Sequence, residues 1–421
     1  MILRAEKSVI NGTITVPASK SHTVRAVAIA SLAQGRSRLF QPLDSNDTRS
    51  AAETYRGFGA DITDSPNEWI VSGNGQPQPC PDEIDVGNSG TTLYIAMSTA
   101  AVCNGTTRMT GDEQIRKRPA RDLLHALTSL GASAESVRGN GCAPLRITGP
   151  MKGGQISIAC PTSQYLTSLL LNCPLAKGDS EITVTLLNEA PYVRMTLDWL
   201  DFQHIEYEQD GMKTFRIPGN QQYRAFTRTI PGDFSSATFF ICAAACTGGS
   251  ITLNNLDMND SQGDKQVADI IEAMGATVTR EQQRITVTGK SLTGGEFDLN
   301  AIPDALPALA VTACFARSQT RLVNVPQARL KETDRIAVMK KELSSLGADI
   351  TELPDGLIIR ESELSHGSVH GHGDHRVVMA MAVAGLAGNG VEVDTAESAA
   401  VTFPDFVQLM KNAGAVIDTE S

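Results

Sequence analysis

Residues 57–62 read GFGADI, and this helix-ending Gly-Ala phrase returns four times along the chain. Glycine directly after the last helical turn is the usual left-handed stop, and the alternating apolar residues that follow are typical of a strand. Successive glycines lie 72, 144, 72 and 67 residues apart, which predicts a sixth, glycine-less copy near residue 203. The chain is therefore predicted to contain six units of about 70 residues. The four later copies are SLGASA (129–134), AMGATV (273–278), SLGADI (345–350) and NAGAVI (412–417).

A second series of signals marks where apolar helices begin. Bodies such as ATFFICAAAC (237–246) and VVMAMAVAGLAG (377–388) are apolar all round, which indicates burial. Each unit is predicted to run strand, buried helix, strand, second helix and further strand, so the fold class is α/β. The predicted helix starts, each after a strand-like stretch, are Lys20, Asn88, Thr162, Asp233, Asp304 and Asp374.

Length, charge and cysteine usage restrict the class of protein. The 421 residues, 41% of them hydrophobic, are enough for two domains with proper cores. A net charge of −11 argues against general binding to nucleic acid or to an anionic membrane. The apolar runs are too short to span a bilayer, the N-terminus lacks a signal-peptide layout, and the eight cysteines form no CxxC pair. We therefore expect a cytoplasmic protein with reduced, buried thiols.

Positively charged side chains lie in the first turns of predicted helices, where such residues are ordinarily disfavoured. In VPASKSHTVRAVAIA (16–30), Lys20 and Arg25 lie in the first turns of an apolar helix. Capping alone explains the Ser, Thr, Asp and Asn residues at the six starts, but a cation opposes the helix macrodipole. A bound anion would relieve that conflict. The six candidate cations are Lys20, Arg25, Arg118, Lys331, Arg335 and Arg376.

Two acids are interleaved with these cations. Asp304 stands in IPDALP and Glu332 in KETDR. Either is explained as an ion-pair partner, and either can serve as a general acid or base once substrate anions occupy the cations. A metal site was also considered, because four of the seven histidines fall in HGSVHGHGDH (366–375). Its glycines favour a loop and no matching carboxylate or cysteine cluster is evident, so we expect no metal.

Ten motifs occur in an order and spacing that resemble the 5-enolpyruvylshikimate-3-phosphate (EPSP) synthase family, and they cover nearly the whole chain. The resemblance implies two similar domains, each of three repeated βαβαββ-like units (an inside-out α/β barrel), with the active site in the interdomain cleft. Domain one would comprise 1–17 and 231–421, and domain two 18–230, in a monomer. The motifs are ASKSHTVRA, LDSNDTR, GNSGTT, RKRP, TSQYLTSLLL, GDFSSA, IPDALPALA, LKETDRIAVM, GDHRVVMA and TFPDF.

The resemblance also implies a reaction. The family moves the enolpyruvyl group of phosphoenolpyruvate onto the 5-hydroxyl of shikimate 3-phosphate and releases phosphate, with no metal or organic cofactor. Each substrate carries a carboxylate and a phosphate, so the pair brings roughly five to six negative charges to six candidate cations. The expected partners are these two small molecules, with no nucleic acid and no membrane.

Site roles follow from the resemblance residue by residue. Asp304 would accept the proton of the 5-hydroxyl, Glu332 would donate a proton to the methylene carbon, and Lys20 would contact both substrates. Shikimate 3-phosphate would be held by Lys20, Ser21, Arg25, Thr162, Ser163, Gln164, Asp304, Gln327 and Lys331. Phosphoenolpyruvate would be held by Lys20, Gly90, Arg118, Gln164, Arg335 and Arg376.

Four positions depart from the family pattern. Many members have arginine at Tyr94, proline at Ile95, serine at Glu189 and lysine at Val401. Tyr94 and Glu189 leave room for a paralogous transferase that acts on a modified acceptor. The related enzyme acting on UDP-N-acetylglucosamine is disfavoured, because GDEQIRKRP (111–119) lacks its loop cysteine. A non-catalytic repeat protein is the alternative of another class, but it would not need Asp304 and Glu332 beside six cations.

Overall fold

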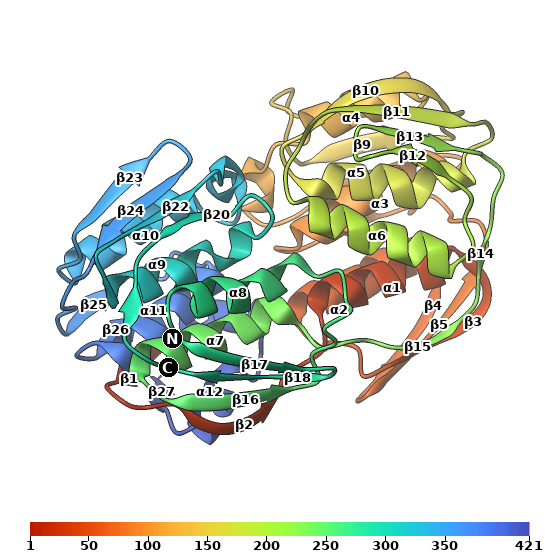
Figure 1. Ribbon diagram of the computed structural model, residues 1–421. Helices are drawn as coiled ribbons and strands as arrows, with labels where there is room; N and C mark the ends of the chain where they lie inside the picture. Colours follow the sequence, from red (N-terminus) through yellow and green to blue (C-terminus); the bar gives the residue numbers. More distant parts are fainter. Residues whose placement is uncertain (421) are drawn as a thin grey trace. The chain divides into compact units, whose positions relative to one another are not determined.

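The computed structural model describes residues 1–420 as two compact units. Unit 1 comprises Met1–Ser19 and Pro231–Ser421, and unit 2 comprises Lys20–Ile230. Unit 2 is thus inserted into unit 1 between strand β2 (Asn11–Thr15) and helix α7 (Phe234–Thr247) (Figure 1).

Each unit contains three sheets of one topology. In each of these sheets the strand or strands that lead the repeat pair in parallel with the strand after its first helix, and the other pairs are antiparallel. The chain order of a complete repeat is strand, helix, strand, helix, strand, strand, so the predicted βαβαββ-like unit and the α/β class are confirmed. Two short strands, β19 (Leu292–Thr293) and β21 (Ala316–Arg317), form an additional parallel pair in unit 1.

The repeats of unit 2 follow the chain, except that the first takes its leading strands from the end of the unit. The first has β14 (Tyr223–Arg224), β15 (Thr227–Thr229), α1 (Lys20–Leu32), β3 (Ala33–Phe40), α2 (Asn46–Gly57), β4 (Asp61–Ser65) and β5 (Glu68–Asn74). The second has β6 (Glu83–Asp85), α3 (Gly90–Val102), β7 (Thr106–Thr110), α4 (Arg121–Ser129), β8 (Ser133–Ser136) and β9 (Leu145–Thr148). The third has β10 (Gly154–Cys160), α5 (Ser163–Asn172), β11 (Ser180–Leu187), α6 (Ala190–Phe202), β12 (Glu208–Asp210) and β13 (Thr214–Ile217).

Unit 1 also has a repeat that joins distant parts of the chain, because its last repeat ends on the N-terminal strand. Its first repeat has β2, α7, β16 (Ser250–Asn254), α8 (Gln266–Ala273), β17 (Thr277–Glu281) and β18 (Arg284–Thr288). The second has β20 (Glu296–Asp298), α9 (Leu306–Cys314), β22 (Gln319–Val323), α10 (Arg335–Ser345), β23 (Ile350–Leu353) and β24 (Gly356–Arg360). The third has β25 (Gly367–Val369), α11 (His375–Ala387), β26 (Val391–Val393), α12 (Phe406–Asn412), β27 (Val416–Glu420) and β1 (Ile2–Glu6).

The first helix of each repeat lies inside its unit and the sheets lie outside (Figure 1). In unit 2, α1, α3 and α5 pack together, and all residues of α3 from Gly90 to Ala101 are buried. In unit 1, α7, α9 and α11 do the same. Their uniformly apolar sequences suit this position, because no face of such a helix meets solvent. Some of the polar groups inside are paired, as where Ser98 Oγ lies 2.5 Å from Ser168 Oγ.

The helix-ending turns explain the repeat that lacks a glycine. At Gly131 the backbone is left-handed, with φ of 94°. The expected sixth turn lies at His204, where φ is 57° and the following Ile205 N–H donates to the Leu200 carbonyl over 3.0 Å. A left-handed turn is accessible to a non-glycine residue at some conformational cost. The copy near residue 203 is therefore confirmed, with histidine at the position where its counterparts have glycine.

The cysteines are all free, and five of the eight are buried. Burial raises the pKa of Cys242, inside α7, to about 12. Among residues 1–420, no helix combines the length and the apolar character that crossing a bilayer requires.

Candidate functional site

Three of the six predicted helix starts are capped by their own side chains. Thr162 accepts from Gln164 N–H at α5, Asp233 from Ser236 N–H at α7, and Asp374 from Arg376 N–H at α11. Capping thus accounts for the oxygens at these starts. It does not account for the cations that stand beside them.

Lys20, the first residue of α1, has an anionic partner within unit 2. Its ammonium lies 3.1 Å from Oδ2 of Asp47, a buried residue of α2. The predicted conflict with the helix macrodipole is therefore relieved by a protein carboxylate. Asp47 is not among the predicted site residues, although it stands in the LDSNDTR motif.

Arg25 lies one turn further along α1, and among residues 1–420 its hydrogen-bond acceptors are all neutral. With 1% of its surface exposed, it donates to the carbonyls of Ser21 and Tyr192 and to the hydroxyls of Thr167 and Thr196. Burial lowers the pKa of Arg25 to about 10. A buried guanidinium with neutral partners is what an anionic ligand would stabilise. Ser21 contributes its carbonyl to this arrangement.

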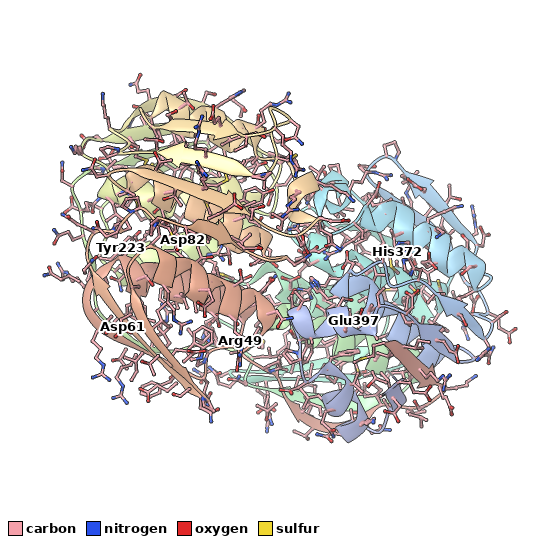
Figure 2. The ribbon with its side chains drawn as sticks, turned by 180° about the vertical axis from the view of Figure 1, so that it is seen from behind. Arg49, Asp61, Asp82, Tyr223, His372 and Glu397 are labelled. Carbon is pink, nitrogen blue, oxygen red and sulfur yellow. The ribbon has the colours of Figure 1, made fainter. Side chains whose placement is uncertain are left out.

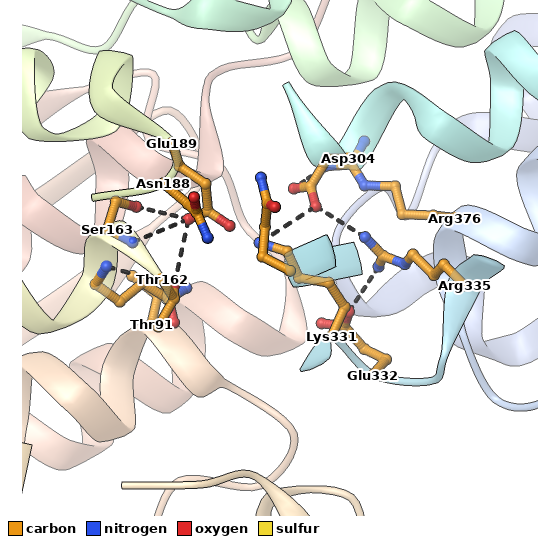
Figure 3. A network of polar contacts seen from close by, with 12 residues as sticks. Thr91, Thr162, Ser163, Asn188, Glu189, Asp304, Lys331, Glu332, Arg335 and Arg376 are labelled. Atoms are coloured by element: carbon orange, nitrogen blue, oxygen red, sulfur yellow. Dashed lines mark hydrogen bonds and ion pairs between the residues drawn. The ribbon is translucent and has the colours of Figure 1, made fainter. Parts of the chain in front are cut away.

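The start of α5 holds the carboxylate of Glu189, a position that the sequence marks only as a departure from the family pattern. Oε2 of Glu189 accepts from Ser163 Oγ at 2.7 Å, and from Ser163 N–H and Thr162 Oγ1 at 3.2 Å each (Figure 3). The side chain of Gln164 points elsewhere, with Nε2 donating to Thr91 Oγ1 over 2.8 Å. Three predicted phosphate-binding residues thus lie together, two of them bonded to a resident anion.

Arg118 is placed by close packing against the start of α3. A Cβ added to Gly90 would lie 2.1 Å from Nη1 of Arg118, so only glycine admits the guanidinium. The carbonyl of the next residue, Pro119, accepts from the hydroxyls of Tyr94 and Tyr165, at 2.8 and 2.5 Å. Tyr94 therefore positions the arginine loop, a role that differs from supplying the positive charge that many family members have at this position.

Asp304 in unit 1 is surrounded by cations (Figure 3). Its carboxylate lies 2.8 Å from Arg335, 3.5 Å from Arg376 and 3.8 Å from Lys331. Burial alone would raise the pKa of Asp304, but the charges of Lys331, Arg376 and Arg335 outweigh it and hold that pKa well below its usual range. In this state Asp304 is ionised and a weak base.

Arg335 joins three carboxylates at the start of α10. Besides Asp304, it contacts Glu332 at 2.6 Å and Asp374 at 2.9 Å. Burial works to lower the pKa of Arg335, but the charges of Asp374, Glu332 and Asp304 raise it above its usual value. Asp374 is completely buried, and it both caps α11 and fixes Arg335. The sequence showed Asp374 as a helix start but gave no sign of this ion pair.

The remaining predicted residues of unit 1 lie among the same elements. Arg376 donates to the carbonyl of Ser235 over 3.0 Å, and its guanidinium lies 5.7 Å from the centre of the Phe239 ring. Gln327 is buried in a short 3₁₀ turn, Pro326–Leu330, and its Nε2 donates to the Asn300 carbonyl over 2.9 Å. Gln327 Oε1 has no hydrogen-bond partner within residues 1–420, so an acceptor is available to a ligand.

The predicted site residues divide by unit into two sets, which are named the unit 2 cluster and the unit 1 cluster. The unit 2 cluster is Lys20, Ser21, Arg25, Gly90, Arg118, Thr162, Ser163 and Gln164. The unit 1 cluster is Asp304, Gln327, Lys331, Glu332, Arg335 and Arg376. The first cluster offers helix-start donors and cations, which suit anionic groups. The second adds two carboxylates among cations, which suit proton transfer to and from an anionic substrate.

The histidine-rich loop pairs with acids of its own unit. Nδ1 of His370 lies 2.5 Å from Asp394, and Nε2 of His372 lies 2.8 Å from Glu342. Figure 2 labels His372 of this loop. Each of these histidines thus has one carboxylate partner. Across the described residues, 1–420, no three or more metal-ligating side chains gather into a group.

Comparison with known proteins places the chain in a family. The family model described as EPSP synthase (3-phosphoshikimate 1-carboxyvinyltransferase) matches residues 5–410. A 3-phosphoshikimate 1-carboxyvinyltransferase of Acetivibrio thermocellus is 53% identical over 421 residues, covering 100% of both chains. One of Ruminiclostridium cellulolyticum is 52% identical over 420 residues, covering 99% of this chain and 100% of the relative.

Solved structures agree on the fold. An EPSP synthase from Acinetobacter baumannii superposes with a TM-score of 0.84 at 26% identity, and the match covers 100% of both chains. The enolpyruvyl transferase NikO from Streptomyces tendae has a TM-score of 0.81 at 18% identity, covering 99% of this chain and 98% of that one, and shows the fold alone. Because a family model matches nearly the whole chain and full-length relatives exceed half identity, the chain belongs to the EPSP synthase family.

Proposed function

We propose that this protein is a transferase that moves the enolpyruvyl group of phosphoenolpyruvate to the 5-hydroxyl of shikimate 3-phosphate and releases phosphate. Family membership over residues 5–410 supports this activity. The observation that carries the site assignment is the contact of one guanidinium, Arg335, with both Asp304 and Glu332. It puts the two candidate proton-transfer groups beside a cation that attracts the substrate's negative charge.

The unit 1 cluster accounts for the timing of proton transfer. Without substrate, Lys331, Arg335 and Arg376 keep Asp304 ionised and weakly basic. When the phosphate and carboxylate of phosphoenolpyruvate take up those cations, the charge that depresses the pKa of Asp304 is compensated and its basicity rises. Asp304 then takes the proton of the 5-hydroxyl as that oxygen attacks C2 of phosphoenolpyruvate.

Glu332 would take up a proton when the substrate's anions displace it from Arg335, and would deliver that proton to the methylene carbon in the same addition, which yields a tetrahedral adduct. Loss of a methyl proton and cleavage of the C–O bond to phosphate then form the enol ether and free phosphate. Atoms balance without an oxidant or reductant, and the proposal includes no metal or organic cofactor. We assign the removal of the hydroxyl proton and the delivery of the carbon proton to separate carboxylates, because one group cannot be acid and base at two atoms simultaneously.

The unit 2 cluster would bind the acceptor. Thr162 and Ser163 offer two hydroxyls and a backbone N–H at the start of α5, where the helix dipole favours an anion. Arg25, buried among neutral acceptors, and Lys20 supply positive charge. Arg118, packed against Gly90, would contribute to phosphoenolpyruvate binding. The protein would act as a monomer in the cytoplasm, without nucleic acid or membrane partners.

A phosphate-release assay tests the proposal. Phosphate should appear from phosphoenolpyruvate only when shikimate 3-phosphate is also present. It should not appear with unphosphorylated shikimate or with UDP-N-acetylglucosamine as the acceptor. Release that is independent of the acceptor, or faster with another acceptor, would contradict the assignment.

A further inference from the structure

Glu189 places a carboxylate on the donors at the start of α5. Its side chain is 2% exposed, and one oxygen, Oε2, accepts all three hydrogen bonds from Thr162 and Ser163. Under the proposed function these donors hold the phosphate of the acceptor. The protein thus supplies its own anion to the place where a substrate anion is expected (Figure 3).

The backbone fixes Glu189 in this position. It has φ of 61° and ψ of 39°, a left-handed conformation that costs energy for a residue with a Cβ. The preceding Asn188 ties the turn to the loop before α5, since its N–H donates to Cys160 and its side-chain amide to Pro161, at 3.2 and 3.1 Å. The turn between β11 and α6 is therefore anchored to the residues that precede the phosphate-binding donors.

A second observation points to an anionic ligand beside this turn. Arg25 donates to the carbonyl of Tyr192, three residues after Glu189, and all of its acceptors are neutral. This buried cation is available to a negatively charged ligand. A phosphate that reaches it must share the neighbourhood with the Glu189 carboxylate.

Two anions cannot both use the same three donors. An ionised carboxylate and a phosphate are both hydrogen-bond acceptors only, and their like charges repel strongly away from bulk water. Resting on the proposed function, we propose that Glu189 is a resident anion that occupies the acceptor-phosphate subsite and must be displaced when shikimate 3-phosphate binds. Glu189 thereby sets the acceptor affinity and keeps the subsite from free inorganic phosphate, the reaction's own product.

The test compares wild type with Glu189→Gln, which keeps the shape but removes the charge. Calorimetric titration should show shikimate 3-phosphate binding at least about tenfold more tightly to the variant, because one anion no longer has to be displaced. Inorganic phosphate, used as a separate probe, should also bind the variant more tightly. Glu208→Gln is the matched control, because it removes an equal charge from an exposed residue of unit 2 and should leave both affinities unchanged.

Unchanged or weaker binding of both probes to a folded Glu189→Gln protein would overturn the inference and make Glu189 a structural partner of α5. If the amide of Glu189→Gln disturbs the turn, Glu189→Ser serves as the second variant, and it should also bind both probes more tightly. The phosphate titration separates the two proposals. Tighter phosphate binding without any turnover of shikimate 3-phosphate would uphold the resident anion and refute the proposed function.

Discussion

Nη1 of Arg335 lies 2.8 Å from Oδ1 of Asp304, so the proposed base is held ionised by a residue proposed to bind phosphoenolpyruvate. Similar arrangements occur twice in unit 2, where Asp47 neutralises Lys20 and Glu189 occupies the start of α5. In each place a protein carboxylate stands where a substrate anion is proposed to bind. The unliganded protein can therefore bury these cations and donors without leaving their charge uncompensated.

Replacing Asp304 with asparagine should reduce turnover by at least about a hundredfold, because the amide cannot accept the hydroxyl proton. Binding of shikimate 3-phosphate should persist, since Lys20, Arg25, Thr162 and Ser163 remain. Steady-state rates beside calorimetric titration check both statements. Asp349→Asn removes an exposed carboxylate of unit 1 and should leave turnover near wild type. Near-normal turnover of Asp304→Asn would refute its role as base.

Glu332→Gln should also slow turnover by at least about a hundredfold, because no proton reaches the methylene carbon. Its distinct signature is isotopic. In deuterated water, wild type with both substrates should place deuterium at the methylene carbon of phosphoenolpyruvate or product, and the variant should lose this incorporation with its turnover. Glu361→Gln, at an exposed position of unit 1, is the control. Incorporation at the wild-type rate would assign the acid to another residue.

Gly90→Ala should raise the KM for phosphoenolpyruvate by tenfold or more. The added Cβ would meet Nη1 of Arg118 at 2.1 Å, so the guanidinium must move. Affinity for shikimate 3-phosphate should change little, because α5 and Arg25 are untouched. Gly57→Ala is a matched helical control, since the nearest atom to its Cβ would be Cys80 Sγ at 3.2 Å. An unchanged KM would show that Arg118 does not contact this substrate.

His375 should make the folded protein less stable in mild acid. Burial lowers the pKa of His375 to about 3, from an ordinary value of 6.5. Between these values the unfolded chain binds one more proton than the folded chain at this residue. The contribution of His375 to stability is therefore fully present above pH 6.5, and it falls by at most ~1.4 kcal/mol per pH unit as the pH falls toward 3.

Melting temperatures measured from pH 7 to pH 4 check this sign. The melting temperature of His375→Gln should fall less steeply than that of wild type, because the glutamine does not titrate. Carboxylates common to both proteins contribute equally to the two curves. Parallel curves would mean that His375 becomes protonated in the folded protein at the same pH as in the unfolded chain.

The repeat architecture was predictable because it is written in local signals. Gly131 and its counterparts mark helix ends, and the apolar helix bodies mark the interior. The same spacing predicted a turn near residue 203, and the structure has it at His204, where the residue type gives no signal. A left-handed turn requires a positive φ, which histidine can adopt, although glycine does so more easily.

The candidate cations were also visible in sequence, but their partners were not. Asp374 looks like a helix cap, and nothing local shows that it is also the buried partner of Arg335, 39 residues away along the chain. Asp47 and Glu189 are likewise brought to Lys20 and Ser163 by packing between different helices and turns. Ion pairs of this kind depend on tertiary structure, and no spacing rule within one helix can predict them.

The most direct test of enolpyruvyl transfer follows the carbon atoms themselves. Phosphoenolpyruvate labelled with ¹³C at C2 and C3 should be mixed with the protein and shikimate 3-phosphate, and observed by NMR. The account predicts that the label appears in an enol ether at the acceptor's 5-oxygen, with one phosphate released for each ether formed. If the label is recovered as the carbonyl carbon of pyruvate, with phosphate released but no ether formed, the account is contradicted. Label left unreacted would contradict it as well.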